Sequence, residues 1–141
     1  MKPLFQLASL MLLVLSACNP ENQKPAVAED DIDAARNFIR AALDGDYKQA
    51  RTIIVDDSTN KQSLDLYEWN YNNNISDDDR KAYKSSSIRM LDVHKLNDSV
   101  TIVHYSNSYK DKPDSLKVVK LGGRWLVDLN FAFQKNDSLP Q

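Results

Sequence analysis

The stretch SLKVVKLGGRWLVDLNF, residues 115–131, decides the expected fold most directly. Apolar and polar residues alternate on both sides of Gly122–Gly123, and this period of two is typical of β-strands. Two glycines suit a two-residue hairpin turn that needs positive φ. The turn predicts these pairs: Leu121 with Arg124, Val118 with Val127, Leu116 with Leu129, and Lys117 with Asp128. The opposite charges of the last pair support this register. We expect the face with Trp125, Val127, Leu129 and Phe131 to line the core.

A second hairpin is predicted directly before the first. Residues 87–96 and 99–109 show the same period of two and flank Asn97–Asp98, a pair typical of hairpin turns. The second half of the chain is therefore expected to form antiparallel strands.

Upstream of residue 87 the apolar residues recur at helical spacing. The longest predicted helix lies within residues 30–46, with an aspartate able to cap its start and Gly45 suited to a left-handed end. Its predicted inner face comprises Ile32, Ala35, Phe38, Ile39 and Ala42. Shorter helices are predicted within residues 46–55, 62–71 and 76–83. In the last of these, Ser76 and Asp79 form a variant of the capping box.

Helices followed by antiparallel strands predict an α+β domain in which one curved sheet wraps around packed helices. The length of 141 residues fits one domain, which we place at residues 30–133, with a frayed tail at 134–141. The 18 basic and 20 acidic residues give a net charge of −2 and no basic surface typical of nucleic-acid binding.

The start of the chain has the pattern of an export signal. Lys2 precedes an apolar run from Leu4 to Leu15, which is shorter than the roughly 20 residues of a membrane-spanning helix. The tetrad at residues 15–18, Leu-Ser-Ala-Cys, resembles the lipobox of bacterial lipoproteins. The resemblance implies that residues 1–17 are a signal peptide and that the Cys18 thiol receives a diacylglycerol. Cleavage before Cys18 then gives a new amino terminus, which is acylated as well, with palmitate as the expected fatty acid. The alternative is an ordinary secretory signal in which the cysteine occurs by chance.

Residues 18–29 then form the lipidated cysteine and a proline-containing tether without apolar periodicity. Asn19 follows the cysteine, and by resemblance to enterobacterial sorting rules this favours the outer membrane, facing the periplasm. The inner membrane and the opposite leaflet stay open as alternatives. The expected location is the bacterial cell envelope, and the expected membrane contact is the lipid on Cys18.

Three motifs carry a resemblance to a known family: Phe38 and Ala42 in the first helix, residues 45–47 (Gly-Asp-Tyr), and residues 123–127 (Gly-Arg-Trp-Leu-Val). Over residues 30–131 the chain resembles a family of bacterial domains of unknown function, family 4878, within the nuclear transport factor 2-like, or cystatin-like, superfamily. The resemblance implies a cone-shaped half-barrel whose open end can form a pocket. Members of the superfamily include isomerases, dehydratases and proteins that only bind partners, so the fold alone implies no activity.

His104 is the first candidate for a pocket residue, because it alternates with Val100 and Ile102 and is expected on the concave face. A histidine there can act as a general base near neutral pH. The favoured interpretation is a histidine at the edge of the core, bonded to a neighbour. Tyr67, Trp69 and Tyr71 are candidates to line a sugar or peptide pocket, with ordinary core packing as the alternative.

The sequence contains no catalytic triad pattern, phosphate-binding loop, dinucleotide-binding glycine set or zinc-ligand spacing. The acidic run at residues 77–79 is interpreted as a helix cap, not a calcium site. No catalytic residue, cofactor or metal is therefore predicted. The favoured function is a lipid-anchored cell-envelope binding or scaffold module with an unknown protein or small-molecule partner and no nucleic acid. The alternative is a small-ligand pocket protein or an isomerase- or dehydratase-like enzyme on the same fold.

Overall fold

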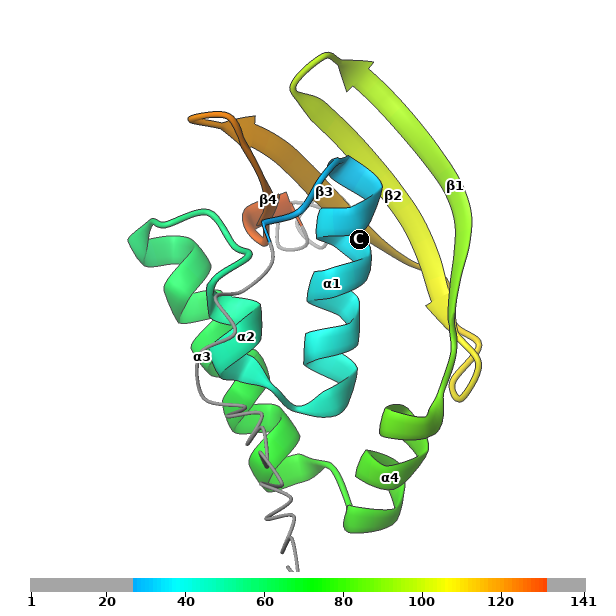
Figure 1. The fold of residues 1–141 in the computed structure, drawn as a ribbon. Helices are drawn as coiled ribbons and strands as arrows, with labels where there is room; N and C mark the ends of the chain where they lie inside the picture. The colour runs from blue at the N-terminus through cyan, green and yellow to red at the C-terminus, as the bar shows by residue number, and fades with distance from the viewer. Residues whose placement is uncertain (1–26, 132–141) are drawn as a thin grey trace, which may run out of the picture.

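The computed structural model describes residues 27–131, which adopt an α+β architecture (Figure 1). Four helices come first in these residues: α1 (Asp31–Asp44), α2 (Tyr47–Arg51), α3 (Ser58–Asn74) and α4 (Asp77–Ser85). Four strands follow: β1 (Ile88–Asn97), β2 (Val100–Asn107), β3 (Asp114–Leu121) and β4 (Arg124–Asp128). They form one antiparallel sheet in the order β1-β2-β3-β4. The predicted α+β class is confirmed, while the predicted signal peptide, Cys18 and the tail at 134–141 lie outside the described residues.

Helix α1 is the central element, and its ends follow from its sequence. The Asp30 side chain accepts a hydrogen bond from the backbone N–H of Asp33 at 2.8 Å, which caps the start. Gly45 ends the helix in the left-handed conformation, with φ of 73°. The helix contacts all four strands, and the sheet curves around it (Figure 1). We call the face of the sheet that is turned toward α1 the inner face.

The buried side chain of Asp31 attaches the start of α1 to the sheet through a hydrogen bond and an ion pair. Asp31 is 2% exposed and accepts a hydrogen bond from Oγ1 of Thr101, a fully buried β2 residue, at 2.5 Å. The ammonium group of Lys95 on β1 lies 3.5 Å from the same carboxylate. Thr101 therefore belongs to the inner face.

The hydrophobic core lies between the helices and the inner face. Its members come from α1, α2 and the segment after it, α3, the sheet and the residue after β4: Ala34, Ala35, Phe38, Ile39, Ala41, Tyr47, Ala50, Ile53, Ile54, Leu64, Tyr71, Val103, Leu116, Val118, Val127 and Leu129. The predicted core positions Val127 and Leu129 are buried, whereas Trp125 and Phe131 are half-buried. None of the helices within residues 27–131 combines the length and the apolar character needed to cross a membrane.

The β3–β4 hairpin has the predicted turn and register. Gly122 and Gly123 have φ of 55° and 77°, as a two-residue turn of this kind requires. The ladder pairs Leu121 with Arg124, Val118 with Val127, and Lys117 with Asp128. In the last pair Nζ lies 3.1 Å from Oδ2. Because β4 ends at Asp128, the predicted pair of Leu116 with Leu129 is not part of this ladder.

The β1–β2 hairpin differs from its prediction by one residue. The turn consists of Asp98–Ser99, and Asn97 pairs with Val100. The register shifts again between Met90 and Asp92, which leaves Leu91 as an exposed irregularity. Such a bulge changes which side chains face the core.

Candidate functional site

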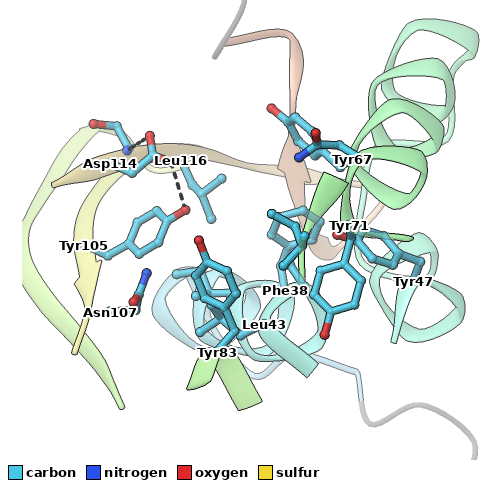
Figure 2. Close-up of a pocket in the computed structure, with 15 residues that line it drawn as sticks. Phe38, Leu43, Tyr47, Tyr67, Tyr71, Tyr83, Tyr105, Asn107, Asp114 and Leu116 are labelled. Atoms are coloured by element: carbon cyan, nitrogen blue, oxygen red, sulfur yellow. Dashed lines mark hydrogen bonds between the residues drawn. The ribbon is translucent and has the colours of Figure 1, made fainter. Parts of the chain in front are cut away.

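A pocket of about 330 Å³ lies between the helices and the inner face of the sheet (Figure 2). Five tyrosines, a group of apolar residues and a few polar ones line it: Phe38, Ile39, Ala42, Leu43, Tyr47, Tyr67, Asn70, Tyr71, Ile75, Tyr83, Tyr105, Asn107, Asp114, Ser115 and Leu116. Its volume is within the range of pockets that hold small molecules. We call this the tyrosine pocket.

The sheet side of the tyrosine pocket is built by a pair of neighbouring residues. Tyr105 on β2 and Asp114 at the start of β3 are partners in the ladder. The Tyr105 hydroxyl donates a hydrogen bond to Oδ2 of Asp114 at 3.3 Å, and the backbone N–H of Ser115 donates to Oδ1 at 2.7 Å. Figure 2 shows both side chains at the same side of the pocket. Asp114 is exposed, so its carboxylate lies where the pocket meets solvent.

Burial raises the pKa values of three phenol groups of the pocket above their ordinary value of about 10, at which they are already protonated near neutral pH. Burial raises the pKa of Tyr105, and the nearby Asp114 carboxylate raises it further. The pKa of Tyr67 is raised by the same two causes in the same order. Burial, together with the neighbouring Tyr71, raises the pKa of Tyr47 to about 12. These side chains are therefore neutral hydrogen-bonding groups at physiological pH.

The helix side of the pocket depends on α4, none of whose residues is fully buried. Arg40 on α1 holds the end of this helix by donating hydrogen bonds to the carbonyls of Ser86 at 2.7 Å and Tyr83 at 3.1 Å. Arg80 holds its start by donating to the carbonyl of Tyr71 at 3.0 Å. Two arginines, and not apolar burial, thus position the Tyr83 ring in the pocket wall.

The connection between β2 and β3 provides a second attachment for α4. The rings of Tyr83 and Tyr109 meet edge to face, with centroids 5.2 Å apart. The Tyr109 hydroxyl donates a hydrogen bond to Asp79, and Nζ of Lys110 lies 3.6 Å from the same carboxylate. Lys110 also lies 4.5 Å from the centroid of the Tyr109 ring. This cluster joins the outer side of α4 to the strands.

Two of the three aromatic residues predicted on α3 belong to the pocket. Tyr67 and Tyr71 line it, as expected. Trp69 is absent from the lining and is 56% exposed, so its predicted place in the pocket is corrected. The reason is helical geometry, because two residues along an α-helix rotate a side chain by about 200°.

His104 lies on the outer face of the sheet, so its predicted place on the concave face is corrected. Its neighbours Val103 and Tyr105 face the helices, and successive strand residues alternate between faces. Its Nδ1 lies 2.8 Å from Oγ of Ser115, its partner in the ladder. The prediction failed because β2 carries apolar residues on both faces, Ile102 as well as Val103. A histidine bonded to a neighbour was the interpretation favoured from the sequence.

Tyr47, Tyr83, Tyr105 and Asp114 were not among the pocket residues predicted from the sequence. Tyr105 and Asn107 continue the apolar stripe of Val103 at spacing of two. Their spacing from Val103 places both residues on the inner face, and this alternation is the signal in the sequence that could have identified them. The approach of Tyr83 from α4 has no comparable signal, since it depends on Arg40 binding carbonyls more than 40 residues away.

The described residues do not contain three or more His, Cys, Asp or Glu side chains placed to hold a metal ion. In the acidic run at residues 77–79, the backbone N–H of Asp79 donates a hydrogen bond to Oγ of Ser76 at 3.1 Å, which confirms the predicted helix cap.

Comparison of the chain with protein families, with curated proteins and with solved structures found no match.

Proposed function

We propose that this chain is a lipid-anchored protein of the bacterial cell envelope that binds a small ligand in the tyrosine pocket. The pocket itself carries the proposal. The pocket is a cleft between α1, α3, α4 and the sheet, and two other hollows of the described residues have similar volumes of about 300 and 270 Å³. What distinguishes this one is its lining of five tyrosines. Its mixture of aromatic rings with a few polar groups is typical of ligand sites.

The location part of the proposal rests on the lipobox-like residues 15–18. Two or more acyl chains hold a protein stably at a membrane, whereas a single chain holds it weakly. A small-ligand pocket protein was the alternative expected from the sequence, where a binding or scaffold module was favoured, and we now place this alternative first because of the pocket.

We also propose that the domain belongs to the nuclear transport factor 2-like cones. The arrangement of α1 against the inner face of a curved antiparallel sheet supports this (Figure 1). So do the structural roles of Gly45 at the end of α1 and of Gly123 in the last hairpin. In such a cone the tyrosine pocket occupies the open end.

The two other interpretations receive less support. A scaffold protein needs no unfilled pocket. An isomerase- or dehydratase-like enzyme was proposed with His104 as its base, and this side chain lies on the outer face, bonded to Ser115. We therefore place ligand binding before catalysis.

The proposal is tested with a variant in which an added side chain occupies the tyrosine pocket. In Ala42→Phe a ring replaces the methyl group of a lining residue on α1, and in the control Arg36→Phe the same ring is added on the exposed side of that helix. The full-length parent and both variants are expressed in a bacterium, purified and extracted for mass spectrometry of bound small molecules. We expect a molecule to accompany the parent and Arg36→Phe and to be lost from Ala42→Phe at an unchanged unfolding temperature. Equal recovery from all three proteins would contradict the proposal.

A further inference from the structure

We infer, on the basis of the proposed function, that the ligand is an organic cation with an ammonium group joined to a compact apolar or aromatic body. The charge of the pocket is the first reason. Among the described residues that line it, Asp114 is the one acidic side chain, and none is lysine, arginine or histidine. The lining residues therefore contribute one negative charge and no positive charge.

Three basic side chains close to the pocket each have a carboxylate of their own. The pairs are Arg40 with Asp44 at 3.0 Å, Arg80 with Asp77, and Lys110 with Asp79 at 3.6 Å. Each of these three cations is thus compensated outside the pocket.

Asp114 has no such partner. Its carboxylate accepts from two neutral donors, the Tyr105 hydroxyl and the Ser115 backbone N–H. Within residues 27–131 it forms no ion pair with a basic side chain. A carboxylate at the mouth of an aromatic pocket, with its charge uncompensated, is a fitting counter-charge for a bound ammonium group.

The tyrosine rings supply the second reason. Ring faces carry negative electrostatic potential and attract cations within about 6 Å, more strongly where water is excluded. The protein already uses its tyrosines in this way, since Arg80 lies 5.9 Å from the centroid of the Tyr71 ring. Lys110 lies over Tyr109, beside the pocket tyrosine Tyr83.

The remaining lining determines the rest of the ligand. Phe38, Leu43, Ile75 and Leu116 offer apolar surface opposite the polar groups. An apolar body of the size of a benzene ring with a short chain fits a volume of about 330 Å³. An anionic ligand of the same shape would meet Asp114 without any basic residue to compensate its charge.

A series of three probes tests the charge of the ligand at constant shape. Phenethylamine is a cation, 2-phenylethanol is neutral and phenylacetate is an anion at pH 7. Their dissociation constants for the purified full-length chain are measured by isothermal titration calorimetry. We expect phenethylamine to bind about fivefold or more tightly than 2-phenylethanol, as a cation between aromatic faces should. Phenylacetate should bind most weakly.

A pair of variants then locates the effect. Asp114→Asn keeps the shape of the pocket mouth and removes its charge, and we expect the preference for the amine to fall to about twofold or less while alcohol binding stays within about twofold. Asp111→Asn removes the same charge from an exposed residue that pairs with Arg89 outside the pocket. This control should retain the full preference, which separates a local effect from a change in net charge.

The outcomes distinguish the two proposals. If 2-phenylethanol or phenylacetate binds as tightly as phenethylamine, or if Asp114→Asn keeps the amine preference, the inference of a cation is wrong and the small-ligand pocket stands. If none of the three probes binds at millimolar concentration, the inference of this ligand class is wrong, while the proposed function is decided separately by the mass spectrometry of Ala42→Phe.

Discussion

Gly45, at the junction of α1 and α2, lies directly against the ring of Tyr71 from α3. A Cβ atom at Gly45 would be 2.5 Å from Cε1 and 2.8 Å from Cζ of that ring. The residue also has φ of 73°, a conformation that L-residues with side chains adopt at a cost. Glycine is therefore required here for two independent reasons, one steric and one conformational. The contact holds a wall of the tyrosine pocket in place, since Tyr71 lines it.

Substitution of this glycine should be costly. Gly45→Ala adds the strain of a left-handed residue, about 1–2 kcal/mol, to an overpacking cost of about 1–3 kcal/mol. We expect the free energy of unfolding, measured in urea, to fall by about 2–4 kcal/mol. Gly122→Ala is the matched control, because Gly122 also has positive φ but nothing within 4 Å of its Cβ position. Equal losses in the two variants would mean that Tyr71 tolerates the added methyl group.

The bond between Asp31 and Thr101 should contribute to stability through its burial. Thr101→Val keeps the shape of the side chain and removes the hydroxyl donor, which leaves a buried carboxylate with one partner fewer. We expect a loss of about 1–3 kcal/mol in the free energy of unfolding. The control Thr52→Val removes an exposed hydroxyl that binds a carbonyl within its own turn and should cost less than about 0.5 kcal/mol. A loss of similar size at both positions would contradict this reasoning.

The lowered pKa of the Asp31 carboxyl group predicts how the free energy of unfolding depends on pH. Burial opposes the charge of Asp31, but the Thr101 hydrogen bond and the Lys95 ammonium outweigh it and lower its pKa below 3.8. A lowered pKa in the folded state gives stability that is present above the unfolded pKa and is lost as pH falls through the folded one. We therefore expect the acid-induced loss of stability below about pH 4 to be smaller in Asp31→Asn. Urea unfolding at several pH values between 2 and 6 measures this, and a parallel decline in both proteins would contradict it.

The β3–β4 hairpin could be predicted in detail because its signals are local and agree with one another. Two glycines define the turn, the turn defines the register, and the register brings Lys117 opposite Asp128. Helix α1 could be predicted for the same reason, since its cap at Asp30 and its end at Gly45 are encoded within a few residues. The β1–β2 hairpin lacks a glycine turn, and its register moved by one residue.

The pocket could be predicted in part only, because its five tyrosines come from four separate elements. Tyr67 and Tyr71 share one helix and were predicted together. Which residues of β2 point toward the helices depends on the contact of Thr101 with Asp31. These two residues are 70 positions apart in the sequence. Without this contact, the apolar residues on both sides of β2 leave the direction of His104 undetermined. Side chains that meet through such contacts have no periodic pattern in the sequence.

Arg40 should control the opening of the pocket from its place between α1 and α4. It donates to the carbonyls of Tyr83 and Ser86, and α4 has no fully buried residue to replace these bonds. In Arg40→Met we expect the backbone amides of α4 to exchange with solvent about tenfold faster, while those of β3 are unchanged. Arg36→Met removes an exposed arginine from the same helix and should leave exchange in α4 unaffected. Equal protection of α4 in all three proteins would show that other contacts hold it.

A substitution of Cys18 distinguishes the two interpretations of residues 1–17, the lipoprotein signal peptide and the ordinary secretory signal. If residues 15–18 form a lipobox, Cys18→Ser removes the only thiol of the chain and with it the attachment point for lipid. We expect the variant, expressed in a bacterium, to lose labelling by a fatty-acid probe, to keep its uncleaved leader and to retain a higher mass than the parent after lipid removal. If the leader is an ordinary secretory signal, serine, a small residue, leaves cleavage and location unchanged. Ser16→Ala serves as the control, since it preserves a small residue before the cysteine and should keep the label. Labelling that survives in Cys18→Ser would refute Cys18 as the attachment point, and absence of label from the parent itself would favour the ordinary secretory signal.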